Sequence, residues 1–240
     1  MPLPKISTPT YELELPSSNK KIKYRPFLVK EEKILIMALE SENMKEISNA
    51  VKNVISDCII TRGVKIDQLA TFDIEYLFLN IRAKSVGESV EVNIICPDDN
   101  TTEVKVEIFV DDIQVQRDSE HTDLIRLDNE LSIKMRYPSL DEFVENNFET
   151  GEGNSDVDKS LDVITSCIEK IFSKEDSWSV SDCTKKEVQD FVEQMNTKQF
   201  KDVEKFFSTM PKLSHTIKVK NPNTNVESDV VLEGLASFFS

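Results

Sequence analysis

The chain has 240 residues, of which 44 are acidic and 29 are Lys or Arg, and its formal net charge is −15. The 39% of hydrophobic residues, with 13 Phe among them, predicts a globular protein of one large or two small domains. The acidic balance argues against nonspecific binding to nucleic acid or to anionic lipid, because both need a basic surface. No apolar run approaches the ~18–20 residues of a membrane span, and no hydrophobic signal core is expected at the N-terminus.

The first segment is predicted to be an extended, basic arm. Residues 1–33 contain seven Lys or Arg against four Glu. Apolar and polar residues alternate over 11–15, a turn follows, and 22–24 is predicted to return as a second strand. We interpret the arm as a partner-binding edge strand, with the alternative that it covers this protein's own sheet. Its candidate binding residues are Lys20, Lys21, Lys23, Arg25 and Phe27.

Three helices are predicted after the arm. Glu31 places negative charge at the start of the apolar run 31–39, as is typical of a helix N-terminus. Apolar residues over 47–58 share one helical face, and Gly63 is placed to end that helix. A third helix is predicted to begin near residue 73, with an apolar side that extends to Ile81.

The hydrophobic period then changes from 3.6 to 2, which predicts antiparallel hairpins. Residues 90–94 and 104–108 alternate on either side of the turn Cys96–Asn100. A comparable unit closes the chain, where 217–219 and 226–232 flank the turn Asn221–Asn225. The shared pattern suggests a duplicated element, although the sequence identity between the two hairpins does not establish a repeat.

The region between these hairpins is predicted to be largely helical. A strand at 131–135 precedes a capping-box sequence at 139–142. One apolar stripe runs over 157–172 and predicts a single helix. A second capping box opens a helix over 184–195, and a last helix at 200–210 is ended by the following proline.

These elements predict an α+β fold in which helices pack on antiparallel, hairpin-based sheets. We expect two segments: residues 1–137, with the arm, the helices and the first hairpin, and residues 138–240, a helical segment with the C-terminal hairpin. The chain ends in an apolar run that is expected to dock, because such a terminus is unfavourable in water. It docks on the protein itself or binds a partner; the candidate residues are Leu235, Phe238 and Phe239.

Residue types that carry catalysis or bind metals form no recognised motif. The five glycines match neither a dinucleotide-binding nor a P-loop pattern. The four cysteines, which indicate a reducing cytoplasm, are Cys58, Cys96, Cys167 and Cys183; the two histidines are His121 and His215. Their scatter predicts no metal and no cofactor, and leaves a cysteine-dependent enzyme as a minor alternative. Acidic pairs such as Asp98–Asp99 are interpreted as solvated charge, within a stretch, 98–130, of 11 acidic and three basic residues.

Several segments together resemble one protein family. They are Pro2–Pro4, Tyr11–Leu13, Leu15–Ser17, Lys23–Lys33, Asp73–Phe78, Arg82–Glu88 and Leu232–Leu235. The pattern spans nearly the whole chain and is similar to that of the baseplate hub proteins of T-even-like contractile-tailed phages, especially those of cyanophage type.

The resemblance implies a non-enzymatic viral protein that acts through contacts with other baseplate hub proteins. Its expected place is the tail baseplate of the virion, after assembly in the host cytoplasm. The family includes hub subunits and assembly factors, so a chaperone that is not retained in the virion is the alternative. Some relatives carry paired cysteines at the two hairpin turns. Here the first turn keeps only Cys96 and the second has none, so no metal role is carried over.

Overall fold

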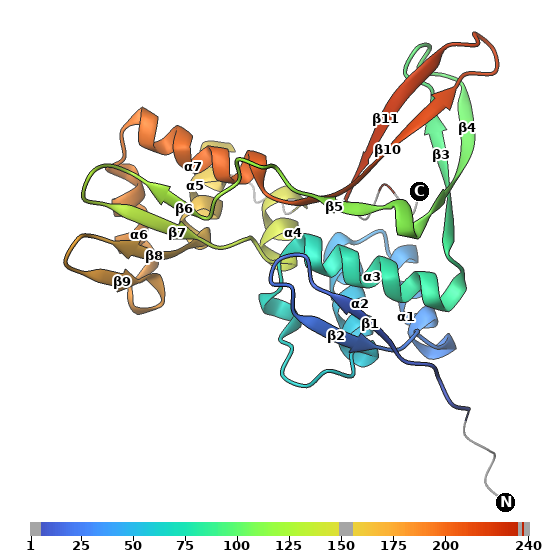
Figure 1. Cartoon of the computed structure of the whole chain (residues 1–240), viewed down its shortest axis with the longest axis horizontal. Coiled ribbons are helices and arrows are strands. Elements are labelled where there is room, and N and C mark those ends of the chain that lie inside the picture. Colours follow the sequence, from blue (N-terminus) through green and yellow to red (C-terminus); the bar gives the residue numbers. More distant parts are fainter. Residues whose placement is uncertain (1–5, 149–155, 235–236, 238–240) are drawn as a thin grey trace, which may run out of the picture. The chain divides into compact units, whose positions relative to one another are not determined.

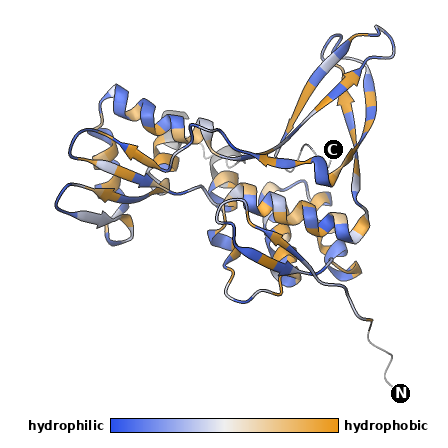
Figure 2. Ribbon diagram, viewed as in Figure 1, coloured by the Kyte–Doolittle hydropathy of each residue, from blue (hydrophilic) through white to orange (hydrophobic). Residues whose placement is uncertain are grey.

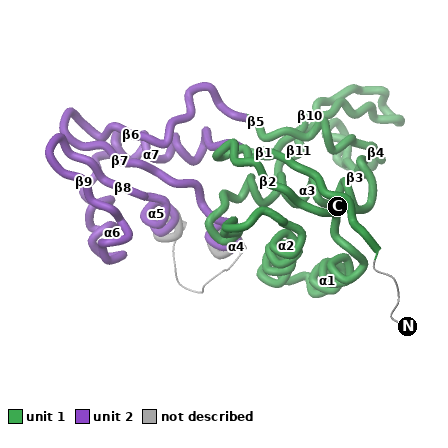
Figure 3. The backbone as a smooth tube through the Cα atoms, turned by 60° about the horizontal axis from the view of Figure 1, so that its bottom comes forward, with its two compact units in different colours: residues 1–116, 212–240 green, residues 117–211 purple. Residues whose placement is uncertain are grey.

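The computed structural model describes residues 6–148, 156–234 and 237. Within these residues the chain forms seven α-helices and four small antiparallel sheets, which confirms the predicted α+β class (Figure 1). The chain folds into two compact units, residues 1–116 with 212–240 (unit 1) and residues 117–211 (unit 2) (Figure 3). These units differ from the expected segments 1–137 and 138–240. The C-terminal hairpin returns to the first part of the chain because it pairs with the strand Gln114–Gln116.

Unit 1 begins with the predicted hairpin and three helices. These elements are β1 (Tyr11–Glu14), β2 (Lys21–Tyr24), α1 (Val29–Glu40), α2 (Met44–Cys58), the 3₁₀ turn η1 (Ile66–Gln68) and α3 (Thr71–Val86). Asp73 accepts the backbone N–H of Ser17 at 2.9 Å and so attaches the β1–β2 turn to the start of α3. Helix α2 ends at Cys58, before Gly63, because Ile59 leaves the helix and forms a β-bridge with Tyr24.

The rest of unit 1 consists of two long hairpins and a short strand. They are β3 (Ser89–Ile95), β4 (Glu103–Phe109), η2 (Val110–Asp112), β5 (Gln114–Gln116), β10 (Lys212–Lys220) and β11 (Glu227–Glu233). Strand β10 lies between β11 and β5, and β3 pairs with β4. Apolar residues on one face of each hairpin, among them Val92 and Val219, share a buried core with Leu79 of α3. The alternation along the strands that predicted both hairpins is visible in Figure 2.

The three hairpins of unit 1 share one turn geometry. Leu15, Cys96 and Asn221 each precede a proline and are each followed, four residues on, by an asparagine with positive φ. These asparagines are Asn19 (φ 53°), Asn100 (φ 54°) and Asn225 (φ 61°). Each donates its backbone N–H to the carbonyl of the first residue, over 2.8–2.9 Å. Asparagine tolerates this left-handed conformation better than most residues, so proline and asparagine specify the turn locally.

Unit 2 contains a four-stranded sheet and four helices. The strands are β6 (Leu124–Arg126), β7 (Ser132–Met135), β8 (Ile168–Phe172) and β9 (Ser177–Ser179), in the order β6-β7-β8-β9. The helices are α4 (Leu140–Phe148), α5 (Asp156–Cys167), α6 (Lys185–Glu193) and α7 (Thr197–Thr209), and η3 (Val180–Asp182) precedes α6. Both predicted capping boxes form: Glu142 accepts the N–H of Ser139 at 2.9 Å, and Glu187 accepts the N–H of Thr184 at 2.8 Å.

The prediction of one helix over 157–172 is wrong beyond Cys167. Residues Ile168–Phe172 form β8, which pairs with β7 on one side and β9 on the other. Ile168 and Ile171 are buried at a spacing of three, which suits a helix. It also suits β8, because the β7–β8 register shifts between Lys134 and Met135 and leaves one extra residue, Glu169, on β8. Pairing with two neighbouring strands therefore decided the conformation.

No helix in the described part of the chain combines the length and the apolar character that a bilayer crossing requires.

Candidate partner-binding surfaces

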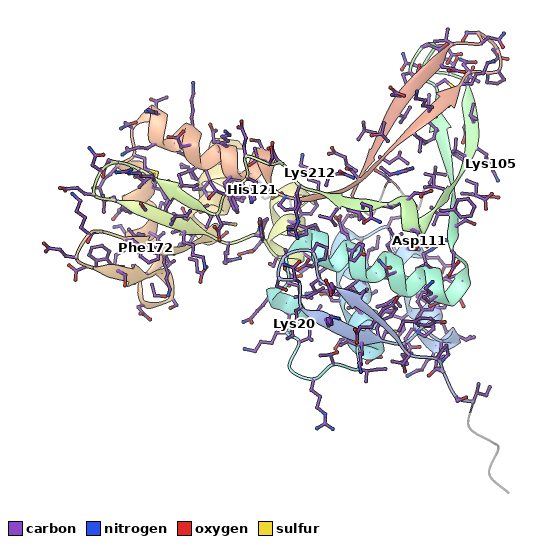
Figure 4. The ribbon with its side chains drawn as sticks, viewed as in Figure 1. Lys20, Lys105, Asp111, His121, Phe172 and Lys212 are labelled. Atoms are coloured by element: carbon purple, nitrogen blue, oxygen red, sulfur yellow. The ribbon has the colours of Figure 1, made fainter. Side chains whose placement is uncertain are left out.

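The basic residues of the arm divide into an exposed group and a buried anchor. Lys20, Lys21 and Lys23 are exposed, and the side chain of Lys20 extends away from the ribbon (Figure 4). Lys21 lies 3.7 Å from Glu12 and 3.6 Å from Glu14 across the hairpin. Among the described residues, Lys20 and Lys23 make no ion pair, so they carry the exposed positive charge of the arm.

Arg25 and Phe27, also predicted to bind a partner, lie inside unit 1. The Arg25 guanidinium, 17% exposed, donates to the Glu31 carboxylate at 2.8 Å and to the Pro26 carbonyl at 2.9 Å. Phe27 is buried, and its backbone N–H donates to the Ser85 hydroxyl of α3 at 2.9 Å. Both residues therefore fix the arm to the helices, and the accessible part of the predicted site is Lys20, Lys21 and Lys23.

Glu31 is a fully buried carboxylate with several charged and polar donors. It accepts from Arg25, from the Lys30 ammonium at 3.0 Å and from the Leu28 backbone N–H at 2.8 Å. Burial alone would raise the pKa of Glu31, but the hydrogen bonds from Arg25, Leu28 and Lys30 lower it to about 2. The sequence predicts Glu31 at the start of a helix, and the structure shows in addition that it forms a buried ion pair with Arg25 there.

Helix α1 carries an exposed apolar face that sequence reasoning missed. The run 31–39 predicts a helix, and several of its large apolar side chains are exposed. Together with two apolar residues that precede the run, the exposed apolar residues are Leu28, Val29, Ile34, Ile36, Met37 and Leu39. The available signal was the run itself, because consecutive apolar residues point to every side of a helix.

Of the predicted C-terminal site, Leu235, Phe238 and Phe239 lie outside the described residues. Leu232, at the start of the same apolar run, belongs to β11 and is buried in the core of unit 1. Leu235, Phe238 and Phe239 therefore stay a prediction.

A polar cluster joins the tips of the two long hairpins, which are more than 100 residues apart in sequence. The buried Asn221 donates from Nδ2 to both carboxylate oxygens of Asp98, at 3.0 and 3.1 Å, and to Asp99 at 2.9 Å. The Thr224 hydroxyl donates to Asp98 at 2.5 Å. Hydrogen bonds from Thr224 and Asn221 lower the pKa of Asp98, and those from Thr102, Thr101 and Asn221 lower that of Asp99. We call Asp98, Asp99, Asn221 and Thr224 the tip cluster.

The cysteine residues give little support to nucleophilic chemistry. Burial raises the pKa of Cys58 and of Cys167 to about 11, and burial with the nearby Asp98 and Asp99 raises that of Cys96. A nucleophilic cysteine needs the opposite shift, because the thiolate is the reactive form. Cys183 donates to the Ser179 carbonyl at 3.6 Å. Among the described residues, no group of three or more His, Cys, Asp or Glu is placed to hold a metal ion.

The two histidines lie in structural positions, one in a hydrogen-bonded aromatic cluster and one on a strand. The His121 ring stacks on Tyr137 with the ring centroids 5.6 Å apart, and its two nitrogens bond to the hydroxyls of Thr209 at 2.9 Å and Tyr137 at 3.0 Å. Burial lowers the pKa of His121. His215 lies on β10, opposite Leu232 of β11. Of the hydrogen bonds found in the described residues, none joins a histidine to a cysteine.

Comparison with known proteins places the chain. The sequence model of one family, described as T4 bacteriophage base plate protein, matches residues 8–240. No curated protein and no solved structure gives a significant match. A baseplate family implies a structural component of the phage tail, located in the tail baseplate with other baseplate proteins as its partners. Since the match covers nearly all of the 240 residues, the chain belongs to the T4 bacteriophage base plate protein family.

Proposed function

We propose that this protein is a subunit of the hub of the phage tail baseplate, of the cyanophage type, and that it acts by non-enzymatic contacts with other hub proteins. The observation that carries the proposal is that residues 20–39 contain both exposed lysines and exposed apolar side chains, in a protein of net charge −15. Family membership supports a structural role, and the segments that resemble hub proteins, such as Lys23–Lys33, support the hub.

Within this segment, the arm is the part that fits an acidic partner. Within the described residues β1 pairs with β2 alone, so its other edge offers backbone groups for strand addition. Lys20 directly precedes β2 and Lys23 lies within it, and within the described part of the chain neither lysine forms an ion pair. Phe27 and Arg25 hold the arm against the helices, so the hairpin is presented as a preformed element.

Reversing the two unpaired charges of the arm is expected to weaken hub binding without unfolding the protein. The double variant Lys20→Glu/Lys23→Glu should lower the affinity for the hub partner about tenfold, because two attractive contacts become repulsive. Pull-down by each co-expressed hub protein, with the melting temperature measured in parallel, reads out both effects. Lys21 stays unchanged because it pairs with Glu12 and Glu14.

The matched control is Lys218→Glu/Lys220→Glu, which changes the net charge equally on exposed positions of β10 in the same unit. Equal binding by the two double variants would exclude a specific role of the arm in partner binding.

The alternative is an assembly factor that shields a hub component and then leaves. Both functions use protein–protein contacts, so the composition of the particle separates them. Mass spectrometry of purified virions is expected to detect the protein at a stoichiometric level. Detection in the lysate of infected cells but not in virions would replace the subunit proposal by the assembly-factor alternative.

A further inference from the structure

Helix α1 carries apolar side chains on two opposite faces, and unit 1 covers one of these faces. Its inner face packs against α2 and buries Glu31 and Ala38. On the outer face, Val29, Ile36 and Met37 are 80%, 50% and 59% exposed. On a surface helix the apolar residues normally form the stripe that faces the core, and polar residues occupy the opposite face. The outer face of α1 therefore has the character of an interface.

Exposed apolar residues are concentrated in this one element. Within the described part of the chain, sixteen large apolar residues are exposed; five of them lie in α1, and Val29, Ile36 and Met37 share its outer face. Single exposed apolar residues are normal on any protein, but a contiguous group of this kind marks a site of association.

The charges on the outer face restrict what covers it. At about 100° per residue, Val29, Lys33, Ile36, Met37 and Glu40 fall within one arc of about 100° on the helix surface. Lys33 and Glu40 are exposed, and neither makes an ion pair among the described residues. Along the helix the face therefore carries the apolar Val29, the positive Lys33, the apolar pair Ile36 and Met37, and the negative Glu40.

We propose that α1 pairs antiparallel with α1 of a second copy of this chain, about a twofold axis that passes between Ile36 and Met37. In this register Ile36 packs against the partner's Met37, and Lys33 lies opposite the partner's Glu40. The twofold axis repeats both contacts, so every exposed charge on the face is paired. A parallel pair would bring Lys33 beside the partner's Lys33, which is repulsive. The face is therefore complementary to itself in the antiparallel direction.

This self-association goes beyond the proposed hub function and is tested on the purified protein alone. One helix pair is smaller than a standard interface, so we expect a dissociation constant in the micromolar range. Sedimentation velocity from about 1 to about 200 µM should show a monomer–dimer equilibrium. A monomer at every concentration overturns the proposal. Loss of hub binding by the arm variant is measured separately, so failure of one proposal does not imply failure of the other.

Charge reversal tests the register. Lys33→Glu and Glu40→Lys should each weaken the dimer about tenfold, because the symmetry makes each substitution act twice. The double variant Lys33→Glu/Glu40→Lys restores opposite charges across the axis and should dimerise about as tightly as the wild type. A double variant that is no tighter than the single variants overturns the antiparallel register.

Met37→Glu tests the apolar centre and is expected to abolish the dimer at about 200 µM, since it places a charge at the axis. The matched control is Ile95→Glu, at a residue 60% exposed on β3 of the same unit, which should dimerise normally. Both residues are exposed, so both variants should keep the melting temperature of the wild type. Equal dimerisation of the two variants overturns the proposal. The proposal is also overturned if the wild type is monomeric and the Met37→Glu variant no longer binds a hub protein in pull-down. In that case the outer face of α1 binds that hub protein.

Discussion

Glu31→Ala is expected to lower the free energy of unfolding of unit 1 by about 3–5 kcal/mol, which is the usual cost of removing one partner of a buried ion pair. Glu31 is fully buried and accepts from Arg25 at 2.8 Å, from Lys30 at 3.0 Å and from the Leu28 N–H at 2.8 Å. Its loss leaves the largely buried Arg25 guanidinium without a carboxylate and removes the contact that holds the arm to the start of α1. Denaturant unfolding, followed by hydrogen exchange of unit 1 amides, measures the effect.

The matched control for this prediction is Glu12→Ala. Glu12 also pairs with a basic residue of the arm, Lys21, but at 3.7 Å and with both side chains exposed. Exposed pairs of this kind contribute about 0–1 kcal/mol, so this variant should unfold almost as the wild type does. Similar losses in the two variants would contradict the role given to burial.

The Glu31 contribution should also depend on pH. Its pKa is about 2 in the folded protein against an ordinary value of 4.5, so the unfolded chain takes up the proton first as the pH falls. The stability from this group is therefore fully present above about pH 4.5 and is lost as the pH falls towards 2. Between pH 6 and pH 2.5, the free energy of unfolding of Glu31→Gln should therefore fall less than that of the wild type, because glutamine does not titrate.

Local patterns in the sequence were sufficient to predict most of the helices and strands. Period-two alternation located the strands of both long hairpins, and the capping boxes at Ser139 and Thr184 located the starts of two helices. These signals work because the hydrogen bonds and the apolar face that they specify lie within one element. The local pattern predicted the wrong conformation for Ile168–Phe172, because its strand depends on pairing with β7, more than 30 residues earlier in the chain.

The candidate surfaces were harder to predict, because exposure is a property of tertiary packing. A cluster of basic residues predicted the arm, and the sequence did not distinguish the exposed Lys20 from Arg25, whose carboxylate partner lies six residues further on. The outer face of α1 was missed because an apolar run indicates a helix without telling which side is covered. Asn221 gave no signal, since its partner Asp98 is 123 residues away in the chain.

Asn221→Ala is expected to destabilise unit 1 by about 2–3 kcal/mol, because it removes a buried side chain with several hydrogen bonds. Asn221 donates to Asp98 and Asp99, and its Oδ1 accepts the backbone N–H of Asn223 at 2.8 Å and of Thr224 at 3.3 Å. Without the amide, two adjacent carboxylates lose a shared donor, and the contact between the tips of the two hairpins is weakened. Besides the melting temperature, faster exchange of the Cys96 N–H, which donates to the Thr102 carbonyl at 2.8 Å, should report the opening.

Asn221→Asp keeps the shape and the two accepted hydrogen bonds but replaces the donor by a third carboxylate in the tip cluster. At pH 7 it should therefore be less stable than Asn221→Ala, and it should recover relative to that variant as the pH falls to 4, because protonation removes the repulsion and restores a donor. The matched control is Asn223→Ala, an exposed neighbour in the same turn whose side chain donates once, to the Thr102 hydroxyl at 3.0 Å. It should lower the stability by less than about 1 kcal/mol. Equal melting temperatures of Asn221→Ala and Asn223→Ala would show that the Asn221 amide does not join the hairpins. The same conclusion would follow if the stability of Asn221→Asp did not rise relative to Asn221→Ala as the pH falls to 4.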